Sequence, residues 1–155
     1  MRTDHRIVVG VDGSEGGRRA LQWAIHEAQA RGCTVQAVCA WRWDSYDIAP
    51  YAVTHPDEER ARAERILAGE VTALASLHGV SVATEAVEGR AADVLTAASR
   101  GAELLVLGSH GHSRVRHTVL GSVAEECVRK ATCPVVVLPV PTLRVAPLAE
   151  PVVRA

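Results

Sequence analysis

Residues 103–122 read ELLVLGSHGHSRVRHTVLGS, a segment that changes character twice. The run 103–108 is short, apolar and continuous, which is typical of a strand buried on both faces of a sheet. A loop that contains glycine follows. Ser122 and Glu125 then form a capping-box pattern, which predicts a helix from Ser122 to about Ala131. A strand, a long loop and a helix therefore succeed one another here.

The same alternation extends along the rest of the chain. Helix signals include Ser14 as an N-cap, Gly32 just past a last turn and Pro56 at a first helical position. The apolar pattern predicts strands at 6–11, 34–41, 80–87, 103–108 and 134–138, and helices at 14–31, 56–79, 91–98 and 122–131. Strands separated by helices predict an α/β protein with a parallel sheet covered on both faces, and a doubly wound open sheet is the favoured topology.

The composition fits one domain of this kind. The chain has 155 residues, and we assign 1–140 to a single domain and the Pro-containing residues 141–155 to a C-terminal extension. The formal charge of −1 argues against a protein that coats nucleic acid or an anionic membrane. Apolar runs are far shorter than the roughly 20 residues of a membrane span, and no signal peptide is recognised, so we expect a cytoplasmic protein. The cysteines form no C-x-x-C pair and are expected to be small buried hydrophobes: Cys33, Cys39, Cys127 and Cys133.

Two predicted strand ends carry polar residues and glycines, and ligands of open α/β sheets bind at such ends. Val11-Asp12-Gly13-Ser14 follows the first strand, and the glycine loop, residues 108–122, follows the fourth. Glycines let backbone N–H groups approach an anion, and this loop leads to a helix N-terminus. Further donors are Ser109, Arg114, Arg116 and Ser122. The pattern predicts a phosphate site that is neither a Walker loop, since no G-K-[ST] follows, nor a G-x-G-x-x-G loop.

Other interpretations of these segments stay open. Asp12 could cap the following helix or form an Asx turn, and the glycine loop could be a plain connection. His110, His112 and His117 form a weak zinc pattern, and we interpret them as exposed or next to phosphate. The segment 41–51 fits a lid that stacks on a ligand, a partner surface, or a loop folded on its own side chains. Its aromatic residues are Trp41, Trp43, Tyr46 and Tyr51.

The spacing Gly108-x2-Gly111-x9-Gly121-Ser122 resembles the nucleotide motif G-x2-G-x9-G-[ST] of the universal stress protein family, and the similarity extends over nearly the whole chain. Members with this motif intact typically bind ATP or a related adenine nucleotide. The resemblance implies a Rossmann-like, five-stranded parallel sheet in the order 3-2-1-4-5. It also implies homodimers, often formed through the last strand, here residues 135–137.

By position, the resemblance implies roles for individual residues. Asp12, between Val11 and Gly13, would lie by the adenosine or the metal-phosphate end, and Ala40 would offer backbone hydrogen bonds to adenine. The ribose and the phosphates would lie along Gly108, Ser109, Gly111, Gly121, Ser122 and Val123. The resemblance does not decide which polar side chain between the last two glycines reaches phosphate: His112, Arg114, Arg116 or His117.

The favoured function is therefore an adenine-nucleotide-binding protein of the stress response, with ATP and Mg²⁺ as ligands. It would regulate rather than catalyse; no catalytic residue and no direct metal ligand is assigned, and slow hydrolysis of bound ATP would be incidental. One alternative is an ATP-utilising enzyme of the related adenine-nucleotide α-hydrolase-like fold, but its S-G-G-x-D-S and H-x-G-H motifs are not found here. Another is a dimeric interaction module without nucleotide, and the intact glycine motif counts against it. Nucleic acid and membranes are not expected as partners.

Overall fold

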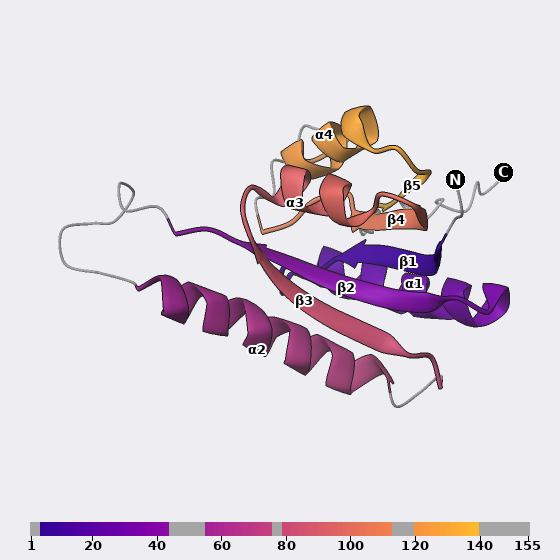
Figure 1. The fold of residues 1–155 in the computed structure, drawn as a ribbon, viewed down its shortest axis with the longest axis horizontal. Helices are drawn as coiled ribbons and strands as arrows, with labels where there is room; N and C mark the ends of the chain where they lie inside the picture. The colour runs from indigo at the N-terminus through magenta and orange to yellow at the C-terminus, as the bar shows by residue number, and fades with distance from the viewer. Residues whose placement is uncertain (1–3, 44–54, 76–78, 113–119, 140–155) are drawn as a thin grey trace, which may run out of the picture.

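The computed structural model describes residues 4–43, 55–75, 79–112 and 120–139. In this part of the chain the elements are β1 (Asp4–Gly10), α1 (Glu15–Arg31), β2 (Thr34–Trp41), α2 (Pro56–Ala75), β3 (Val82–Glu88), α3 (Ala91–Ala98), β4 (Ala102–Gly108), α4 (Ser122–Lys130) and β5 (Val135–Leu138). The five strands form one parallel sheet in the order β3-β2-β1-β4-β5 (Figure 1). The predicted α/β fold and the strand order are confirmed.

The first strand lies in the middle of the sheet. It pairs with β2 on one side and with β4 on the other, so that Val8 is aligned with both Gln36 and Leu105. The strand order therefore reverses between β1 and β4. At such a reversal the connections leave on opposite faces of the sheet, and a crevice opens at the carboxyl ends of the two strands.

Alternation along β1 separates two hydrophobic cores. Ile7 and Val9 are fully buried in the core shared with α1 and α2, whereas Val8 is fully buried in the core shared with α3 and α4. Figure 1 shows these two pairs of helices on opposite sides of the sheet. Both faces of the central strands are thus covered, which explains why their sequences are continuous apolar runs.

Local signals set the helix ends in α1 but not in α4. Ser14 caps α1 as predicted, because its Oγ accepts the Gly17 N–H at 3.1 Å, and Gly32 ends the helix with a φ of 69°. The predicted capping box at Ser122 is wrong: Gly121 is the N-cap of α4, and no side chain caps the helix. The Gly121 N–H donates to the Ser109 carbonyl at 2.6 Å, so a contact with the end of β4 fixes where α4 begins.

Several other boundaries and burials differ from the prediction. The first strand covers Asp4–Gly10 instead of 6–11, and the third covers Val82–Glu88 instead of 80–87. The second helix is described to Ala75, because residues 76–78 lie outside the described ranges. Three cysteines are buried as expected, but Cys133 is only partly buried, since it lies just before β5 at the sheet edge. Burial raises the pKa of Cys39 and of Cys127 to about 11, which keeps both thiols protonated.

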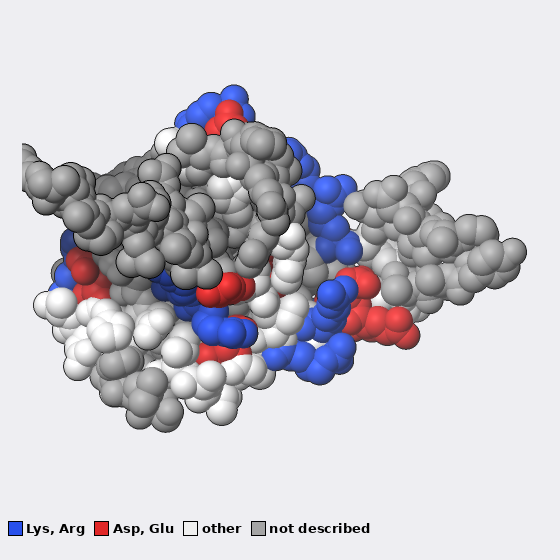
Figure 2. All heavy atoms as spheres, turned by 180° about the vertical axis from the view of Figure 1, so that it is seen from behind, with Lys and Arg blue, Asp and Glu red and all other residues white. Residues whose placement is uncertain are grey.

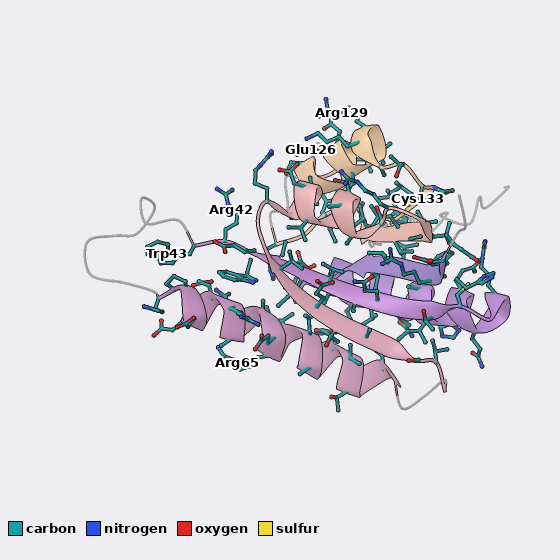
Figure 3. All side chains as sticks on the ribbon, viewed as in Figure 1. Arg42, Trp43, Arg65, Glu126, Arg129 and Cys133 are labelled. Carbon is teal, nitrogen blue, oxygen red and sulfur yellow. The ribbon has the colours of Figure 1, made fainter. Side chains whose placement is uncertain are left out.

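Ion pairs tie the two helices on each face together. Arg18 of α1 donates two hydrogen bonds to the Glu70 carboxylate of α2, at 2.9 and 3.0 Å. On the other face, Glu126 of α4, labelled in Figure 3, accepts from Arg90 at 3.1 Å and from Lys130 at 2.6 Å. Acidic and basic side chains also lie beside one another on the face shown in Figure 2. No helix among the described residues is long and apolar enough to cross a membrane.

The packing at the centre of the sheet predicts a large effect of truncation at Leu105. This side chain is fully buried in β4, so Leu105→Ala leaves a cavity and should lower the free energy of unfolding by about 2–5 kcal/mol. The control Val128→Ala, at a half-exposed position of α4, should change it by less than about 0.5 kcal/mol. Urea denaturation followed by circular dichroism measures both values. Equal losses in the two variants would contradict the described core.

Candidate functional site

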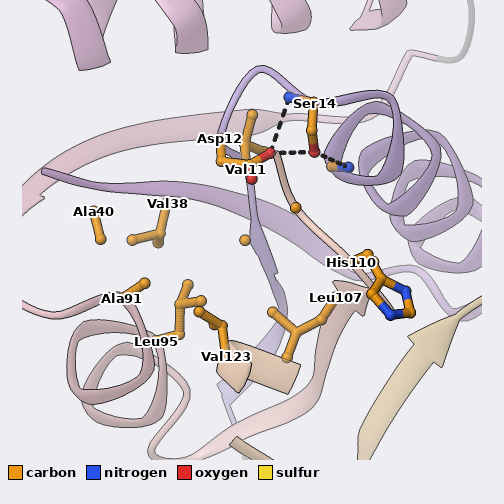
Figure 4. Close-up of a pocket in the computed structure, with 14 residues that line it drawn as sticks. Val11, Asp12, Ser14, Val38, Ala40, Ala91, Leu95, Leu107, His110 and Val123 are labelled. Carbon is orange, nitrogen blue, oxygen red and sulfur yellow. Dashed lines mark hydrogen bonds between the residues drawn. The ribbon is translucent and has the colours of Figure 1, made fainter. Parts of the chain in front are cut away.

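A pocket opens at the carboxyl ends of β1 and β4, where the strand order reverses (Figure 4). Its cavity volume is about 110 Å³. We call it the apolar pocket. Its described lining is Gly10, Val11, Asp12, Ser14, Gly17, Val38, Ala40, Ala91, Leu95, Leu107, Gly108, His110, Gly111 and Val123.

Small and aliphatic side chains from several elements form most of its wall. Val38 and Ala40 come from β2, Leu107 comes from β4, and Leu95 comes from α3. These residues belong to the core shared by α3 and α4 or pack against it, so the pocket continues that core to the edge of the sheet. The carboxyl end of β1 carries Gly10, at which a Cβ would lie 2.9 Å from the Leu107 side chain. A side chain at this position would fill the pocket floor.

A local turn fixes Asp12 at the rim of the apolar pocket. Its carboxylate accepts the Ser14 N–H at 2.9 Å and also hydrogen-bonds with the Ser14 hydroxyl, as the dashed lines in Figure 4 show. Ser14 in turn caps α1 through Gly17. The Asx turn considered for Asp12 is therefore present, and it holds the carboxylate among the residues that line the pocket. Asp12 can therefore form the Asx turn and line the pocket at the same time.

A second, polar pocket adjoins the first. It is lined by Gly13, Ser14, Glu15, Gly16, His110, Gly111 and His112, and it shares three of them, Ser14, His110 and Gly111, with the apolar pocket. The Nε2 atom of His112 lies 2.6 Å from the Asp12 carbonyl oxygen, so the glycine loop is linked to the turn after β1. An apolar space thus leads directly into a polar one between the two strand ends.

The motif glycines are needed for close packing within the protein. A Cβ at Gly111 would lie 2.6 Å from Asp12 Oδ2, and one at Gly121 would lie 2.9 Å from the Ser109 carbonyl oxygen. A Cβ at Gly108 would lie 2.8 Å from the backbone carbon of Gly16. These three glycines are not among those with positive φ. Glycine is therefore required at the motif positions because the glycine loop, the end of β4 and the start of α1 contact one another there.

The structure distributes the predicted site residues over both pockets. The apolar pocket contains Val11, Asp12, Ala40, Gly108, Gly111 and Val123. The polar pocket contains Gly13 and His112. The described lining of neither pocket includes Ser109, Gly121 or Ser122. Arg114, like Arg116 and His117, lies outside the described residues.

Ser109 is buried, and its backbone already has partners. Its N–H donates to the Leu138 carbonyl at 2.8 Å, and its carbonyl accepts the Gly121 N–H. Its hydroxyl lies 3.1 Å from Nδ1 of His110. Ser109 therefore joins the end of β5 to the start of α4.

Sequence reasoning missed the residues that the fold alone brings to the apolar pocket. From the ends of the strands come Gly10, Val38 and Leu107; from the start of α1 comes Gly17; and from α3 come Ala91 and Leu95. The strand residues could have been found, because they precede the predicted carboxyl ends. The contribution of α3 could not, because its apolar pattern does not show which turn covers the end of β1.

The aromatic residues at the end of β2 and beyond it do not all face the apolar pocket. Trp41 packs against the core shared with α1 and α2, whereas its neighbour Ala40 packs against the opposite core and lines the pocket. Successive strand residues point to opposite faces, so the hypothesis that Trp41 stacks on a ligand in this pocket is wrong. Trp43 lies beyond the end of β2 and is 39% exposed (Figure 3). Tyr46 and Tyr51 lie outside the described residues.

The sheet and the position of the pocket define a Rossmann-like α/β protein. The family model described as "Universal stress protein family" matches residues 4–139, and the chain belongs to this family. A universal stress protein of Mycobacterium tuberculosis is 37% identical over 138 residues, which are 85% of this chain and 47% of that protein. One from Mycolicibacterium smegmatis is 34% identical over 142 residues, 88% of this chain and 48% of that protein. The chain spans about half the length of the curated relatives it matches.

Solved structures show the same fold. The universal stress protein UspA from Lactobacillus plantarum has a TM-score of 0.71 at 22% identity, with 89% of this chain and 99% of that chain covered. A universal stress protein in complex with cAMP has a TM-score of 0.65 at 23% identity, with 86% and 95% covered. The universal stress protein from Archaeoglobus fulgidus in complex with dAMP has a TM-score of 0.63 at 26% identity, with 85% and 95% covered.

The contact between Gly121 and Ser109 predicts that Gly121→Ala destabilises the protein. The added methyl group would meet a backbone carbonyl that cannot move freely, at a cost of about 1–3 kcal/mol in the free energy of unfolding. Gly69→Ala is the matched control, since nothing lies within 4 Å of its Cβ in α2, and it should stabilise by about 0.5–1 kcal/mol. Urea denaturation measures both. Stabilisation by Gly121→Ala would contradict the described approach.

Proposed function

We propose that this chain binds an adenine nucleotide, with ATP and Mg²⁺ as its ligands, and acts in stress response as a regulator rather than as a dedicated catalyst. The observation that carries the proposal is the apolar pocket that leads into the polar pocket at the strand reversal. A nucleotide has the same division, with a flat base of low polarity at one end and charged phosphates at the other. The cAMP and dAMP complexes of the structural neighbours support an adenine base.

The base would lie in the apolar pocket. The pairing of β1 with β2 ends at Gly10 and Val38, while β2 continues to Trp41, so Ala40 lies beyond the end of β1. Its backbone is then placed to hydrogen-bond with the edge of adenine, while Leu95 and Val38 contact the ring faces. A purine with a different pattern of donors and acceptors, such as guanine, would fit this edge less well.

The phosphates would lie toward the polar pocket and the start of α4. Gly111 and His112 line the polar pocket, and Gly121 leads into α4, a helix that no side chain caps and whose N-terminus favours negative charge. Ser122, Val123 and Arg114 stay proposed phosphate contacts. Asp12 would face the Mg²⁺ that accompanies the phosphates, because a carboxylate is a ligand that this ion prefers. Ser109 stays a proposed contact through its hydroxyl, which lies 3.1 Å from Nδ1 of His110.

Binding without dedicated catalysis fits the ionisable groups at the site. Among the described residues that line the two pockets, these are Asp12, Glu15, His110 and His112. Oδ1 of Asp12 accepts from Ser14, the carboxylate is proposed to face Mg²⁺, and His112 is hydrogen-bonded to a backbone carbonyl. A general base must instead be free to take a proton from the attacking water. We therefore propose that the protein acts by being in a nucleotide-bound or a nucleotide-free state, and not by converting the nucleotide.

The apolar pocket predicts that a larger side chain at Ala91 blocks nucleotide binding. Calorimetry on the wild type should give micromolar affinity for Mg²⁺-ATP, about −8 kcal/mol, and weaker binding of GTP. Ala91→Leu narrows the pocket from the first turn of α3 and should weaken ATP binding by at least about tenfold, which is about 1.4 kcal/mol. Ala97→Leu places the same side chain on an exposed face of α3 and should leave the affinity unchanged.

Two results would overturn this assignment. A wild type that binds neither ATP, AMP nor cAMP would exclude an adenine-nucleotide site. A folded Ala91→Leu variant with the affinity of the wild type would place the nucleotide outside the apolar pocket.

We also propose a homodimer formed through β5. This strand is the last in the sheet, and its four residues are apolar and only partly buried in the single chain. An uncovered apolar edge is an association surface, and lysine on an edge strand opposes pairing. Sedimentation at tens of micromolar without nucleotide should therefore show a dimer. Val137→Lys should weaken it by at least about tenfold, which is about 1.4 kcal/mol, whereas Thr84→Lys on the opposite edge strand β3 should not. A monomeric wild type would contradict the proposal.

A further inference from the structure

Three metal-ligating side chains meet at the amino-terminal edge of the sheet, at the other end of the strands from the pockets. His5 comes from β1, Glu103 comes from β4, and Cys33 lies between α1 and β2. His5 and Glu103 are 98 residues apart in the sequence, and Cys33 and Glu103 are 70 apart. Among the described residues, this is the only group of three or more histidine, cysteine or acidic side chains that could hold a metal ion.

The three side chains already converge on one carboxylate. His5 Nδ1 lies 2.9 Å from Glu103 Oε1, and the Cys33 thiol donates to Glu103 Oε2 with an Sγ–O distance of 3.2 Å. One ligand atom from each residue lies within 4.8 Å of the other two. Hydrogen bonds from Cys33 and His5 lower the pKa of Glu103, so its carboxylate is charged. Imidazole nitrogen, thiolate sulfur and carboxylate oxygen are the three kinds of ligand that zinc takes in proteins.

The backbone holds this arrangement in place. The pairing of β1 with β4 aligns Asp4 with Ala102 and Ile7 with Leu104, so His5 and Arg6 together lie opposite Glu103. The register of the two strands therefore shifts at this point, and one residue of β1 has no partner of its own in β4. Cys33 is fixed because it follows the left-handed Gly32 and donates its N–H to the Ala28 carbonyl at 2.9 Å. Two members of the group therefore lie on strands, and the third lies in a two-residue connection fixed by a hydrogen bond.

The charges also suit a divalent cation. Burial and the hydrogen bond to Glu103 raise the pKa of the Cys33 thiol, so Cys33 carries its proton until a metal ion displaces it. The resulting Cys33 thiolate and the Glu103 carboxylate would together neutralise two positive charges. Arg31 approaches Glu103 Oε2 at 3.9 Å, but its guanidinium is paired with Glu27 at 2.5 Å, and that pair is neutral as a whole. Cys33 is buried, while the His5 side chain is 81% exposed, which leaves an entry path from solvent.

We propose that His5, Cys33 and Glu103 form a zinc site that is separate from the nucleotide site. On binding, the Cys33 S–H proton leaves to solvent, the imidazole carries its proton on Nε2, and Nδ1, Sγ and a Glu103 oxygen bind the ion. Water completes a tetrahedral coordination. A site with three protein ligands and one exchangeable position is of the open kind, which can take a further ligand from solution or from a partner.

The test is zinc affinity of the full chain, measured by competition with a chromophoric chelator in the absence of nucleotide. We expect one ion per chain in the wild type. His5→Gln, Cys33→Ser and Glu103→Gln should each weaken zinc binding by at least about tenfold. Replacement of a residue that only hydrogen-bonds to a metal ligand already lowers metal affinity by about that factor. His55→Gln and Cys133→Ser are the matched controls and should bind as the wild type does. His5→Gln is at an exposed position, so it tests the site even where a buried substitution impairs folding.

Cobalt gives a second readout that depends on the thiolate. Co²⁺ should produce a sulfur-to-metal charge-transfer band in the wild type and in the His55→Gln variant, and the band should be absent in Cys33→Ser. Equal zinc affinity in the wild type and all three site variants would overturn the proposal. So would binding that survives His5→Gln but is lost when His110 and His112 are both replaced, because the ion would then lie at the glycine loop.

Discussion

The contact between the end of β4 and the start of α1 is the constraint on which the site depends. A Cβ at Gly108 would lie 2.8 Å from the backbone carbon of Gly16, and a Cβ at Gly16 would lie 2.6 Å from the His110 carbonyl oxygen. Glycine at both positions lets α1 begin directly against the glycine loop. The turn that carries Asp12 is thereby brought within reach of His112. One packing contact thus joins the ends of two strands into a single pair of pockets.

The same two strands carry the candidate sites at both edges of the sheet. At their carboxyl ends, β1 and β4 diverge because the strand order reverses, and the pockets open there. At their amino ends, where the register shifts at His5 and Arg6, imidazole and carboxylate groups lie together. The buried centres of both strands separate the two edges. We therefore expect nucleotide and metal to bind independently.

Much of the fold could be predicted from the sequence because its signals are local. The alternation of apolar runs with capped helices predicted every element, and Ser14 and Gly32 set the ends of α1 as expected.

Predictions failed where tertiary contacts decide the local structure. Gly121 rather than Ser122 caps α4 because of its bond to Ser109, and the side chain of Trp41 follows the strand alternation away from the pocket. For the site, strand ends and glycines were predictable, whereas Leu95 of α3 was not. The cluster around Glu103 was not predictable either, because His5 and Glu103 are 98 residues apart and lie together only through a shift in strand register.

The most direct test of this account is a crystal structure of the protein grown with ATP and Mg²⁺. The account predicts adenine in the apolar pocket, between Ala40 of β2 and the first turns of α3, with the phosphates running past Gly111 toward the start of α4. Nucleotide density elsewhere on the chain, or a base that lies in the polar pocket next to His112, would contradict it.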